Sequence, residues 1–514
     1  MAHSYIFDRD RIQSNTQLLA FLQKNFSLLK ESKTHGLCYY FDTFDWRLYR
    51  QGYYLHHYNN TFVLSRLYDK KIEVKQENVL KSPDYLSLPD GPLQQKIAPI
   101  IGIRALMCKA IFRLTEQTVR ILNKDLKTIA RIKFEQSKIK DKSKYIVLPP
   151  FFKILPLRGY ANQIPGILKK LSSLNLSQSK GDRLQRGLSA IGKTPADYTS
   201  KLDIKLNNRM TAETAAKQIY LYLLNIIRKN EFGIIEDIDI EFLHDFRVSI
   251  RRTRSALGQL KGILDEKAVL KAKENFLFLG RSTNNLRDID VYLLKEKQYK
   301  AMLPVELREY LNAFFENLHS QRKTELRSLI AILKSAKYKR IISSWNGYLD
   351  SVTQSNRSSA LSAKLLAQTV IMKRNKKVIK FGKRILLTGS DELLHQLRIE
   401  GKKLRYLLEF FSSLFAQEKI QYLIGKLKIL QDNLGEFNDL IIQQEHLFES
   451  VRNIAPRNKT TKNTLLAMGV LIGKLNERQQ AVKNEFAMLF SNYADKKVQK
   501  IFNELFYVHE RPAK

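Results

Sequence analysis

Two kinds of hydrophobic pattern divide the chain near residue 200. Before this point, short runs of aromatic and β-branched residues alternate with polar residues and turn residues, which is typical of strands. From about Thr211 onward, apolar residues recur every three or four positions and prolines are few, which is typical of amphipathic helices. The pattern predicts an α+β protein with two domains, at residues 1–200 and 205–514.

The first domain is expected to be an antiparallel sheet or barrel, and the second a set of helices. Besides a helix at 16–29 and a short closing helix at 164–174, the first domain has expected strands at 5–7, 38–55, 61–64, 71–74, 113–114, 119–122, 128–134 and 145–148. The second has expected helices at 211–228, 240–264, 267–282, 286–299, 305–337, 360–386, 391–415, 418–434, 437–453 and 460–507.

One stretch of the second domain occurs twice, with an offset of 151 positions. Each copy has a histidine, an arginine three positions later, a basic pair at seven and eight, and an arginine at ten. The first copy is His244, Arg247, Arg251, Arg252 and Arg254, and the second is His395, Arg398, Lys402, Lys403 and Arg405. Asp288 and Asp439 share the offset. The chain is therefore predicted to contain two repeats, at about 208–300 and 360–453.

The repeated cations form a stripe on a helix. At 100° per residue, the positions 0, 3, 7 and 10 of each copy fall within roughly 80° of arc, and only the residue at position 8 points elsewhere. The stripe borders an apolar side that includes Phe246 in the first copy and Leu397 in the second. One such stripe is usually a solvated face. Two copies in one helical phase instead predict duplicated halves that present their cations to a single site across a pseudo-twofold axis.

The overall charge makes an anionic partner plausible. The 514 residues include 88 Lys and Arg but 50 Asp and Glu, a formal charge of +38. Both predicted domains carry the excess, so it does not belong to a tail. Such a charge implies strong self-repulsion unless nucleic acid, anionic lipid or polyphosphate neutralises part of it.

The two copies resemble the CHAD domain, a helical family whose repeats carry H-x2-R-x3-[RK]-[RK]-x-R and bind inorganic polyphosphate. Residues 279–291 and 430–439 resemble a second landmark of this family, although Asn438 stands where the first repeat has Arg287. The resemblance implies that the ten His, Arg and Lys residues of the two copies bind polyphosphate. Asp288 and Asp439 are interpreted as orienting partners of the cations, with helix capping as an equal alternative.

The first domain resembles the CYTH domain, the triphosphate tunnel fold. The resemblance rests on residues 39–43 with Leu48 and Gly52, and on residues 130–135. The family's opening E-x-E-x-K is missing, and 55–58 read Leu-His-His-Tyr instead of the basic L-R-x-R. A metal-assisted triphosphatase needs carboxylates for the ion and cations for the phosphates. We therefore expect a degenerate domain that is not an enzyme.

Three alternatives remain. A residual triphosphatase or polyphosphatase would use Asp8, Asp10 and Glu135 of the first domain. A nucleic-acid-binding protein would suit the charge, but no helix-turn-helix, zinc-finger or RNP-type pattern is present. A metal-dependent phosphohydrolase would use His244 and His395, yet neither has a ligand-type residue four positions later on its helix.

The remaining residues suggest no cofactor, no metal site and no secretion. Cys38 and Cys108 lie in no metal-ligand pattern and are expected to be buried thiols. His56 and His57 are adjacent on an expected strand, so they should face opposite sides of it. No signal-peptide or membrane-spanning stretch is evident. We expect a cytoplasmic protein; the sequence leaves open its oligomeric state, preferred polyphosphate length and any association with polyphosphate granules.

Overall fold

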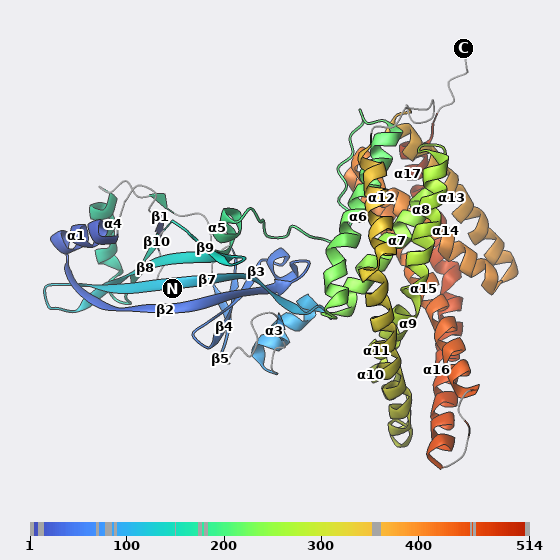
Figure 1. The fold of residues 1–514 in the computed structure, drawn as a ribbon, viewed down its shortest axis with the longest axis horizontal. Coiled ribbons are helices and arrows are strands. Elements are labelled where there is room, and N and C mark those ends of the chain that lie inside the picture. Colours follow the sequence, from blue (N-terminus) through green and yellow to red (C-terminus); the bar gives the residue numbers. More distant parts are fainter. Residues whose placement is uncertain are drawn as a thin grey trace. The chain divides into compact units, whose positions relative to one another are not determined.

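The chain folds into two units, which a computed structural model describes at residues 5–8, 15–67, 71–77, 85–86, 90–149, 151–172, 177–178, 183–351, 361–452, 455 and 459–508. The first unit comprises Met1–Ser200 and the second Lys201–Lys514 (Figure 1). An antiparallel sheet dominates the first unit and helices the second, as the hydrophobic pattern predicts.

Among the described residues of the first unit, eleven strands form one sheet. They are β1 (Tyr5–Asp8), β2 (Ser27–Thr43), β3 (Tyr53–Tyr58), β4 (Thr61–Arg66), β5 (Ile72–Glu77), β6 (Tyr85–Leu86), β7 (Leu106–Leu122), β8 (Thr128–Asp141), β9 (Lys144–Val147), β10 (Phe151–Pro156) and β11 (Ser177–Gln178). Neighbours follow the order β11-β1-β10-β8-β7-β2-β3-β4-β5, while β6 pairs with β7 and β9 with β8. All pairs are antiparallel, which agrees with the predicted sheet.

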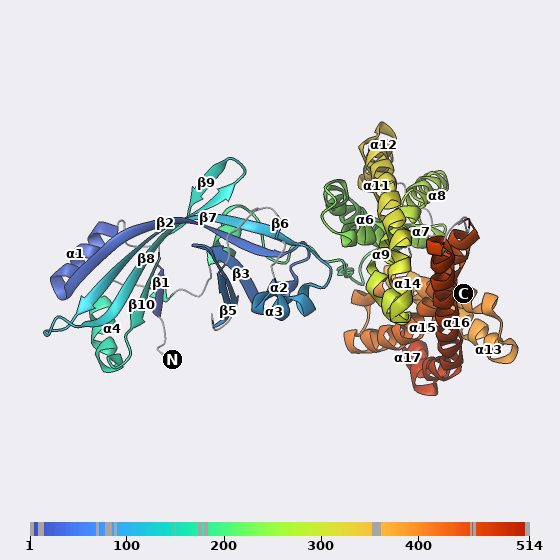
Figure 2. The same cartoon turned by 90° about the horizontal axis from the view of Figure 1, so that it is seen from below.

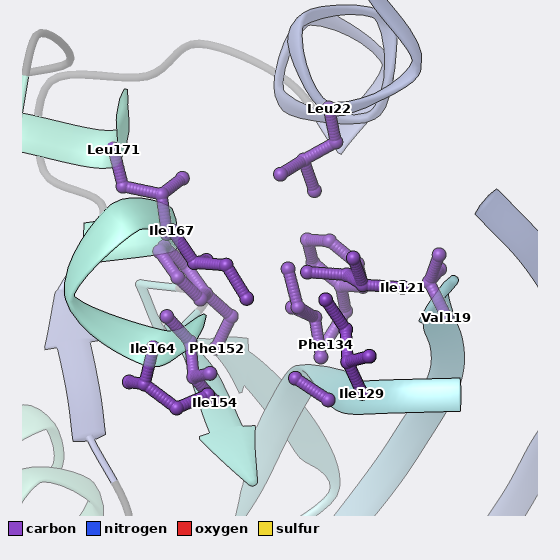
Figure 3. Close-up of a cluster of buried hydrophobic side chains, with 12 residues drawn as sticks. Leu22, Val119, Ile121, Ile129, Phe134, Phe152, Ile154, Ile164, Ile167 and Leu171 are labelled. Carbon is purple, nitrogen blue, oxygen red and sulfur yellow. The ribbon is translucent and has the colours of Figure 1, made fainter. Parts of the chain in front are cut away.

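Short helices pack against this sheet. They are α1 (Asn15–Asn25), α2 (Arg47–Arg50), α3 (Pro92–Ile101), α4 (Ile164–Ser172) and α5 (Arg183–Ala190). Leu22 of α1 and Ile167 of α4 contribute to one buried cluster with Phe134 and Phe152 of the sheet (Figure 3). Burying these side chains removes apolar surface from water, which favours the folded state.

Several expectations for the first unit are wrong in detail, among them the separate strands at 113–114 and 119–122, which are both part of β7. The strand expected at 38–55 is interrupted by α2, because the Asp42 carboxylate accepts hydrogen bonds from the amides of Leu48 and Tyr49 and so holds a helical turn. The helix expected at 16–29 ends at Asn25, and β2 begins at Ser27. Cys38 is buried as expected, but Cys108 is only partly buried.

The second unit is helical (Figure 2). Its helices are α6 (Ala212–Ile235), α7 (Ile240–Gln259), α8 (Glu266–Arg281), α9 (Asn284–Leu294), α10 (Glu296–Met302), α11 (Asn312–Lys334), α12 (Ala336–Asp350), α13 (Ala363–Thr388), α14 (Asp391–Phe410), α15 (Gln417–Arg452), α16 (Lys459–Ala494) and α17 (Lys496–Phe506), with short 3-10 turns at Val305–Leu307, Glu309–Leu311 and Ser412–Leu414. No helix in the described part of the chain is long and apolar enough to cross a bilayer.

The duplication is visible in the helix boundaries. Helices α7 and α14 begin and end at positions that differ by the repeat offset, and α6 and α13 begin at such positions. Their capping residues are equivalent as well: the side chain of Asp239 accepts from the first turn of α7, and that of Ser390 from the first turn of α14. The second unit therefore contains two copies of one helical motif.

A reciprocal contact relates the copies by a pseudo-twofold axis. The amide of Ala212 donates to the carbonyl of Leu361 at 2.7 Å, and the amide of Ala363 donates to the carbonyl of Met210 at 2.9 Å. Each bond is the image of the other under the repeat offset, as in an isologous interface. Tyr292 donates to the carbonyl of its own equivalent, Gln443, at 3.0 Å. This pair therefore lies close to the axis.

The copies differ where the first one breaks its helix. The sequence predicts a break in both, after 282 and after 434, but α15 runs without interruption while α8 and α9 are separate. The hydroxyls of Ser282 and Thr283 bond back to the carbonyls of Phe278 and Gly280 and compete with the helical pattern. The second copy has no hydroxyl there: Asn433 instead donates to Val482 of α16, so its helix continues.

Three helices expected to be continuous are divided. The helix expected at 286–299 is divided into α9 and α10, and the helix expected at 460–507 into α16 and α17. The single helix expected at 305–337 is divided into 3-10 turns, α11 and the start of α12. The Ser335 hydroxyl accepts from the amide of Tyr338 and begins α12 as its N-cap.

Close packing at a glycine gives a test of the helical core. A Cβ on Gly382 of α13 would lie 1.9 Å from the ring of Phe490 on α16, so Gly382→Ala should lower the free energy of unfolding by roughly 1–3 kcal/mol. Gly473→Ala in α16 is the matched control, because its Cβ would meet nothing within 4 Å; it should raise this free energy by about 1 kcal/mol. Urea unfolding measures both, and equal effects of the two variants would contradict the packing.

Candidate functional site

A basic cavity of about 840 Å³ lies between five helices of the second unit. Its walls come from both copies of the motif. The lining residues are His244, Arg247, Val248, Arg251, Arg254 and Ser255 of α7, Lys273 and Leu277 of α8, Arg287, Asp288 and Val291 of α9, Arg398, Ile399, Lys402, Lys403 and Tyr406 of α14, and Asp439 and Ile442 of α15. The two stripes thus meet in one cavity.

Packing of the apolar sides brings the stripes together. Phe246 of α7 and its equivalent, Leu397 of α14, are both fully buried, so each helix turns its adjacent cationic edge toward the other copy. Across the interface, the Nε of Arg251 donates to the hydroxyl of Tyr406 at 2.9 Å. The amide side chain of Gln259 donates to the carbonyl of Lys403 at 3.3 Å. The cations therefore face each other at fixed positions.

The equivalent arginines of the two copies are held in different ways. Arg247 donates through Nη1 to the carbonyl of Gly280 at 3.1 Å and to the hydroxyl of Thr283 at 2.9 Å. These acceptors are available because the first copy breaks its helix there. Arg398 instead donates to the carboxylate of Asp439 at 3.2 Å. This bond places Asp439 as the orienting partner of a cation.

Three predicted binding residues lie outside the cavity lining. Arg252 and Arg405 both approach the carboxylate of Glu409, at 2.8 and 3.5 Å, and their positive charges are thereby partly compensated. The Nδ1 of His395 lies 2.6 Å from the Oδ1 of Asn438. These contacts indicate that Arg252, Arg405 and His395 support the walls of the cavity. Lys403 remains at the cavity and also donates to Glu400 at 2.8 Å.

Several lining residues could not be inferred from the repeated motif. Arg287, whose equivalent in the second copy is Asn438, is not part of the repeated motif, yet it lines the cavity. Lys273 lies on α8, outside both stripes, and only the helical phase of α8 relative to α7 would have identified it. Tyr406 also lines the cavity: its ring is buried, while its hydroxyl accepts from Arg251.

Crowding of like charges shapes the electrostatics of the cavity. Burial, followed by the charges of Arg251 and Arg398, lowers the pKa of Lys402 to about 7. Burial also lowers the pKa of Arg247 and Arg398, the equivalent arginines of the two copies. In all three residues, the lowered pKa means that the folded chain disfavours the protonated, positively charged form. The cavity therefore holds positive charge that the folded chain does not fully compensate.

Two guanidinium nitrogens of arginines that line the cavity are buried and have no hydrogen-bond partner among the described residues. They are the Nη1 of Arg287 and the Nε of Arg398. Burying a charged donor without an acceptor costs free energy of about 1–3 kcal/mol or more. An anion in the cavity would supply acceptors at this position.

The first unit contains a second buried polar cluster, on its sheet. Glu116 of β7 and Glu135 of β8 are directly opposite in register and both are buried. Lys133 approaches Glu116 at 2.8 Å, and Arg183 at the start of α5 forms a two-pronged ion pair with Glu135. Of these residues, only Glu135 belongs to the residues proposed from the sequence for a residual triphosphatase.

This cluster does not fit the divalent ion that the CYTH resemblance implies. The carboxylates of Glu116 and Glu135 each already face a cation, and Arg183 occupies the position beside Glu135 that a metal ion would need. Asp10 lies outside the described residues, and only the backbone of Asp8 is described, in β1. Among the described residues, no three His, Cys, Asp or Glu side chains are grouped as metal ligands.

The adjacent histidines of β3 lie on opposite faces of the sheet, as predicted. The ring of His56 stacks on Tyr40 at 5.5 Å between centroids, while that of His57 packs against Phe62 at 4.5 Å. Burial, followed by the charge of Arg183, lowers the pKa of His56 to about 3. The two imidazoles therefore do not share an ion.

Comparison with known families identifies the helical unit. The family model of the CHAD domain matches residues 218–447, which include both stripes and the cavity lining. This part of the chain is a CHAD domain. The CHAD resemblance drawn from the repeated motif is thereby confirmed.

Three relatives illustrate the extent of similarity. The CHAD domain from the plant Ricinus communis is 22% identical, with 57% of this chain and 96% of that chain covered and a TM-score of 0.47. A putative adenylyl cyclase from Hippeastrum, described as having a dominant triphosphatase activity, is 13% identical, with 39% and 100% covered and a TM-score of 0.25. An uncharacterised protein of Mycobacterium tuberculosis is 24% identical over 301 residues, which are 52% of this chain and 53% of that protein. The chain thus spans about half the length of this curated relative.

The lowered pKa of Lys402 predicts a gain in stability when the residue is made neutral. Because its pKa is about 7 in the folded CHAD domain and 10.5 as a free side chain, folding disfavours the charged form. The resulting cost is fully present below pH 7 and disappears as the pH rises toward 10.5. Lys402→Met should therefore raise the melting temperature at neutral pH, and the difference from the parent should shrink at higher pH. A lower melting temperature at all pH values would contradict the assignment.

Proposed function

We propose that the CHAD domain binds inorganic polyphosphate in the cavity between α7 and α14, without turning it over. The observation that carries this proposal is the convergence of both cationic stripes on one cavity, with Arg287 and Lys273 added to its walls. Arginine offers planar multidentate donors to phosphate oxygens, and lysine offers mobile point charge. The cavity provides both.

The chemistry of the cavity matches a thread of phosphates. Polyphosphate carries repeated negative charge without a base or sugar to be recognised, so its site requires converging cations and few other groups. Bound phosphate oxygens would accept from the buried nitrogens of Arg287 and Arg398 that lack partners among the described residues. Asp288 and Asp439 lie at the cavity too, and Asp439 orients Arg398 by an ion pair, since a carboxylate aimed at phosphate would repel it.

Nucleic acid fits this cavity less well. Tyr406 and Phe437, the aromatic residues near the second stripe, are buried in the core, so they offer no platform on which a base could stack. A volume of about 840 Å³ suits a single strand of phosphates and not a duplex, whose major groove alone is about 12 Å wide. Polyphosphate is therefore the better candidate.

Charge reversal at the equivalent pair Arg251 and Lys402 tests whether the stripes form one site. Each single variant, Arg251→Glu or Lys402→Glu, should weaken polyphosphate binding by roughly 10–100-fold, because each removes a charged contact worth about 1.5–3 kcal/mol. The double variant should lose less than the sum, since the residues share one ligand. Titration calorimetry gives affinity and stoichiometry, and Lys323→Glu on the exposed face of α11 is the control.

The same titrations distinguish other arrangements. In one shared site, binding should weaken steeply with salt, by roughly 0.7–0.9 in log K per unit log[salt] for each phosphate neutralised, by analogy with nucleic acids. Half the stoichiometry at unchanged affinity in each single variant would indicate two separate sites. An effect of Lys323→Glu equal to that of Arg251→Glu would show that only net charge matters.

We also propose that the first unit is not a triphosphatase. The pairing of Glu135 with Arg183 and of Glu116 with Lys133 supports this, since these carboxylates would have to hold the metal ion. The full chain, supplied with triphosphate and magnesium or manganese, should release phosphate no faster than buffer does. Turnover that disappears in Glu135→Gln or Asp8→Ala would contradict the proposal.

A further inference from the structure

A second basic surface lies on α13, away from the cavity. Helix α13 contains no acidic residue, and seven of its cations are exposed. Besides Lys364 near its start, they are Lys373, Lys376, Lys377, Lys380, Lys383 and Arg384, and these last six lie on one side. At 100° per residue these six fall within roughly 120° of arc and extend for about 17 Å along the helix. We call them the α13 basic face. No residue of α13 lines the cavity of the CHAD domain.

The α13 basic face has no compensating charge among the described residues. Arg374, at its edge, pairs with Glu400 of α14, but none of the six forms an ion pair with a described carboxylate. Helix α13 lies at the outer edge of the helical unit in both views (Figures 1 and 2). Its buried side is fixed by Gly382 against Phe490 of α16. The cations therefore point away from the core.

Exposed leucines adjoin the C-terminal end of this face. Leu387 is 86% exposed and Leu386 is 48% exposed, just before α13 ends at Thr388. Leu387 lies one turn beyond Lys383 and Arg384, within the same arc. Large apolar side chains that are exposed to water are stabilised when a partner covers them.

We propose that the α13 basic face is a docking surface for an anionic lipid bilayer. Clusters of four to eight Lys and Arg attract the negative surface of a membrane, and adjacent apolar side chains enter the boundary between headgroups and acyl chains. The six cations and the two leucines provide both parts. This would be peripheral binding at a surface, and it is independent of the proposed polyphosphate site.

Other polyanions fit the α13 basic face less well. A phosphate thread would gain nothing from Leu386 and Leu387. A DNA major groove would have to admit α13, but neighbouring helices flank it: Gln368 donates to the carbonyl of Leu505 on α17 at 3.1 Å, and Arg374 pairs with α14 on the other side. A flat lipid surface needs no such access.

Vesicle co-sedimentation of the full chain tests the proposal. The parent should bind phosphatidylcholine vesicles that contain phosphatidylserine and not vesicles of phosphatidylcholine alone. The triple variant Lys376→Glu, Lys380→Glu and Lys383→Glu should bind at least about 100-fold more weakly, at about fivefold for each cation lost. Leu387→Ser should weaken binding by about tenfold. The control variant Lys323→Glu, Arg327→Glu and Lys339→Glu makes the same change of net charge on exposed positions of α11 and α12 and should keep binding.

Each remaining outcome overturns the proposal. Equal loss in the control variant would show that net charge, and not this face, attracts the vesicles. No effect of Leu387→Ser together with binding of duplex DNA that the α13 variant loses would assign the face to nucleic acid. Absence of vesicle binding by the parent, with its fold verified by circular dichroism, would remove the lipid assignment while leaving the polyphosphate proposal unaffected.

Discussion

Mutual repulsion of cations across the pseudo-twofold axis is the constraint on which the CHAD domain of this protein depends. Arg251 and Lys402 occupy equivalent positions, and the first, together with burial, helps to lower the pKa of the second to about 7. Nothing in their own interaction favours this arrangement. They are held together because the apolar sides of α7 and α14, with Phe246 and Leu397 at their centres, are buried in the core. Hydrophobic burial thus maintains an arrangement of charges that would otherwise separate.

The duplication gives the site its two walls, and the differences between the copies adapt each wall. Thr283 interrupts the first copy and provides an acceptor for Arg247, while the continuous second helix provides Asp439 for Arg398. The two copies also differ at the equivalent positions Arg287 and Asn438. Asn438 gives His395 a hydrogen-bond partner, while Arg287 of the first copy lines the cavity. The site is therefore pseudo-symmetric in its backbone and asymmetric in its side-chain contacts.

The sequence revealed which helices form the site better than it revealed which residues line it. The repeat offset alone identified α7, α14 and their convergence, since equal helical phase and a shared apolar side leave few ways to pack two copies. It could not show that Glu409 engages Arg252, because that contact joins opposite copies, whereas Arg405 approaches Glu409 from one turn away on the same helix. The expected helix boundaries were wrong where a single side chain determines the boundary, as the Ser335 N-cap does for α12. Lys273 lines the cavity because of how α8 packs, and no local sequence pattern predicts that packing.

Proton uptake on ligand binding tests the central claim most directly. Lys402 faces Arg251 of α7, Arg398 and Arg405 of its own helix and Asp439 of α15, and its pKa of about 7 applies to the empty cavity. Phosphate oxygens beside it would raise that pKa, so binding near pH 8 should take up about one proton in a Lys402-dependent manner. Calorimetric titration with polyphosphate in buffers of different ionisation enthalpy measures this uptake. The account predicts an uptake that disappears in Lys402→Met; an equal uptake in the parent and this variant would contradict it.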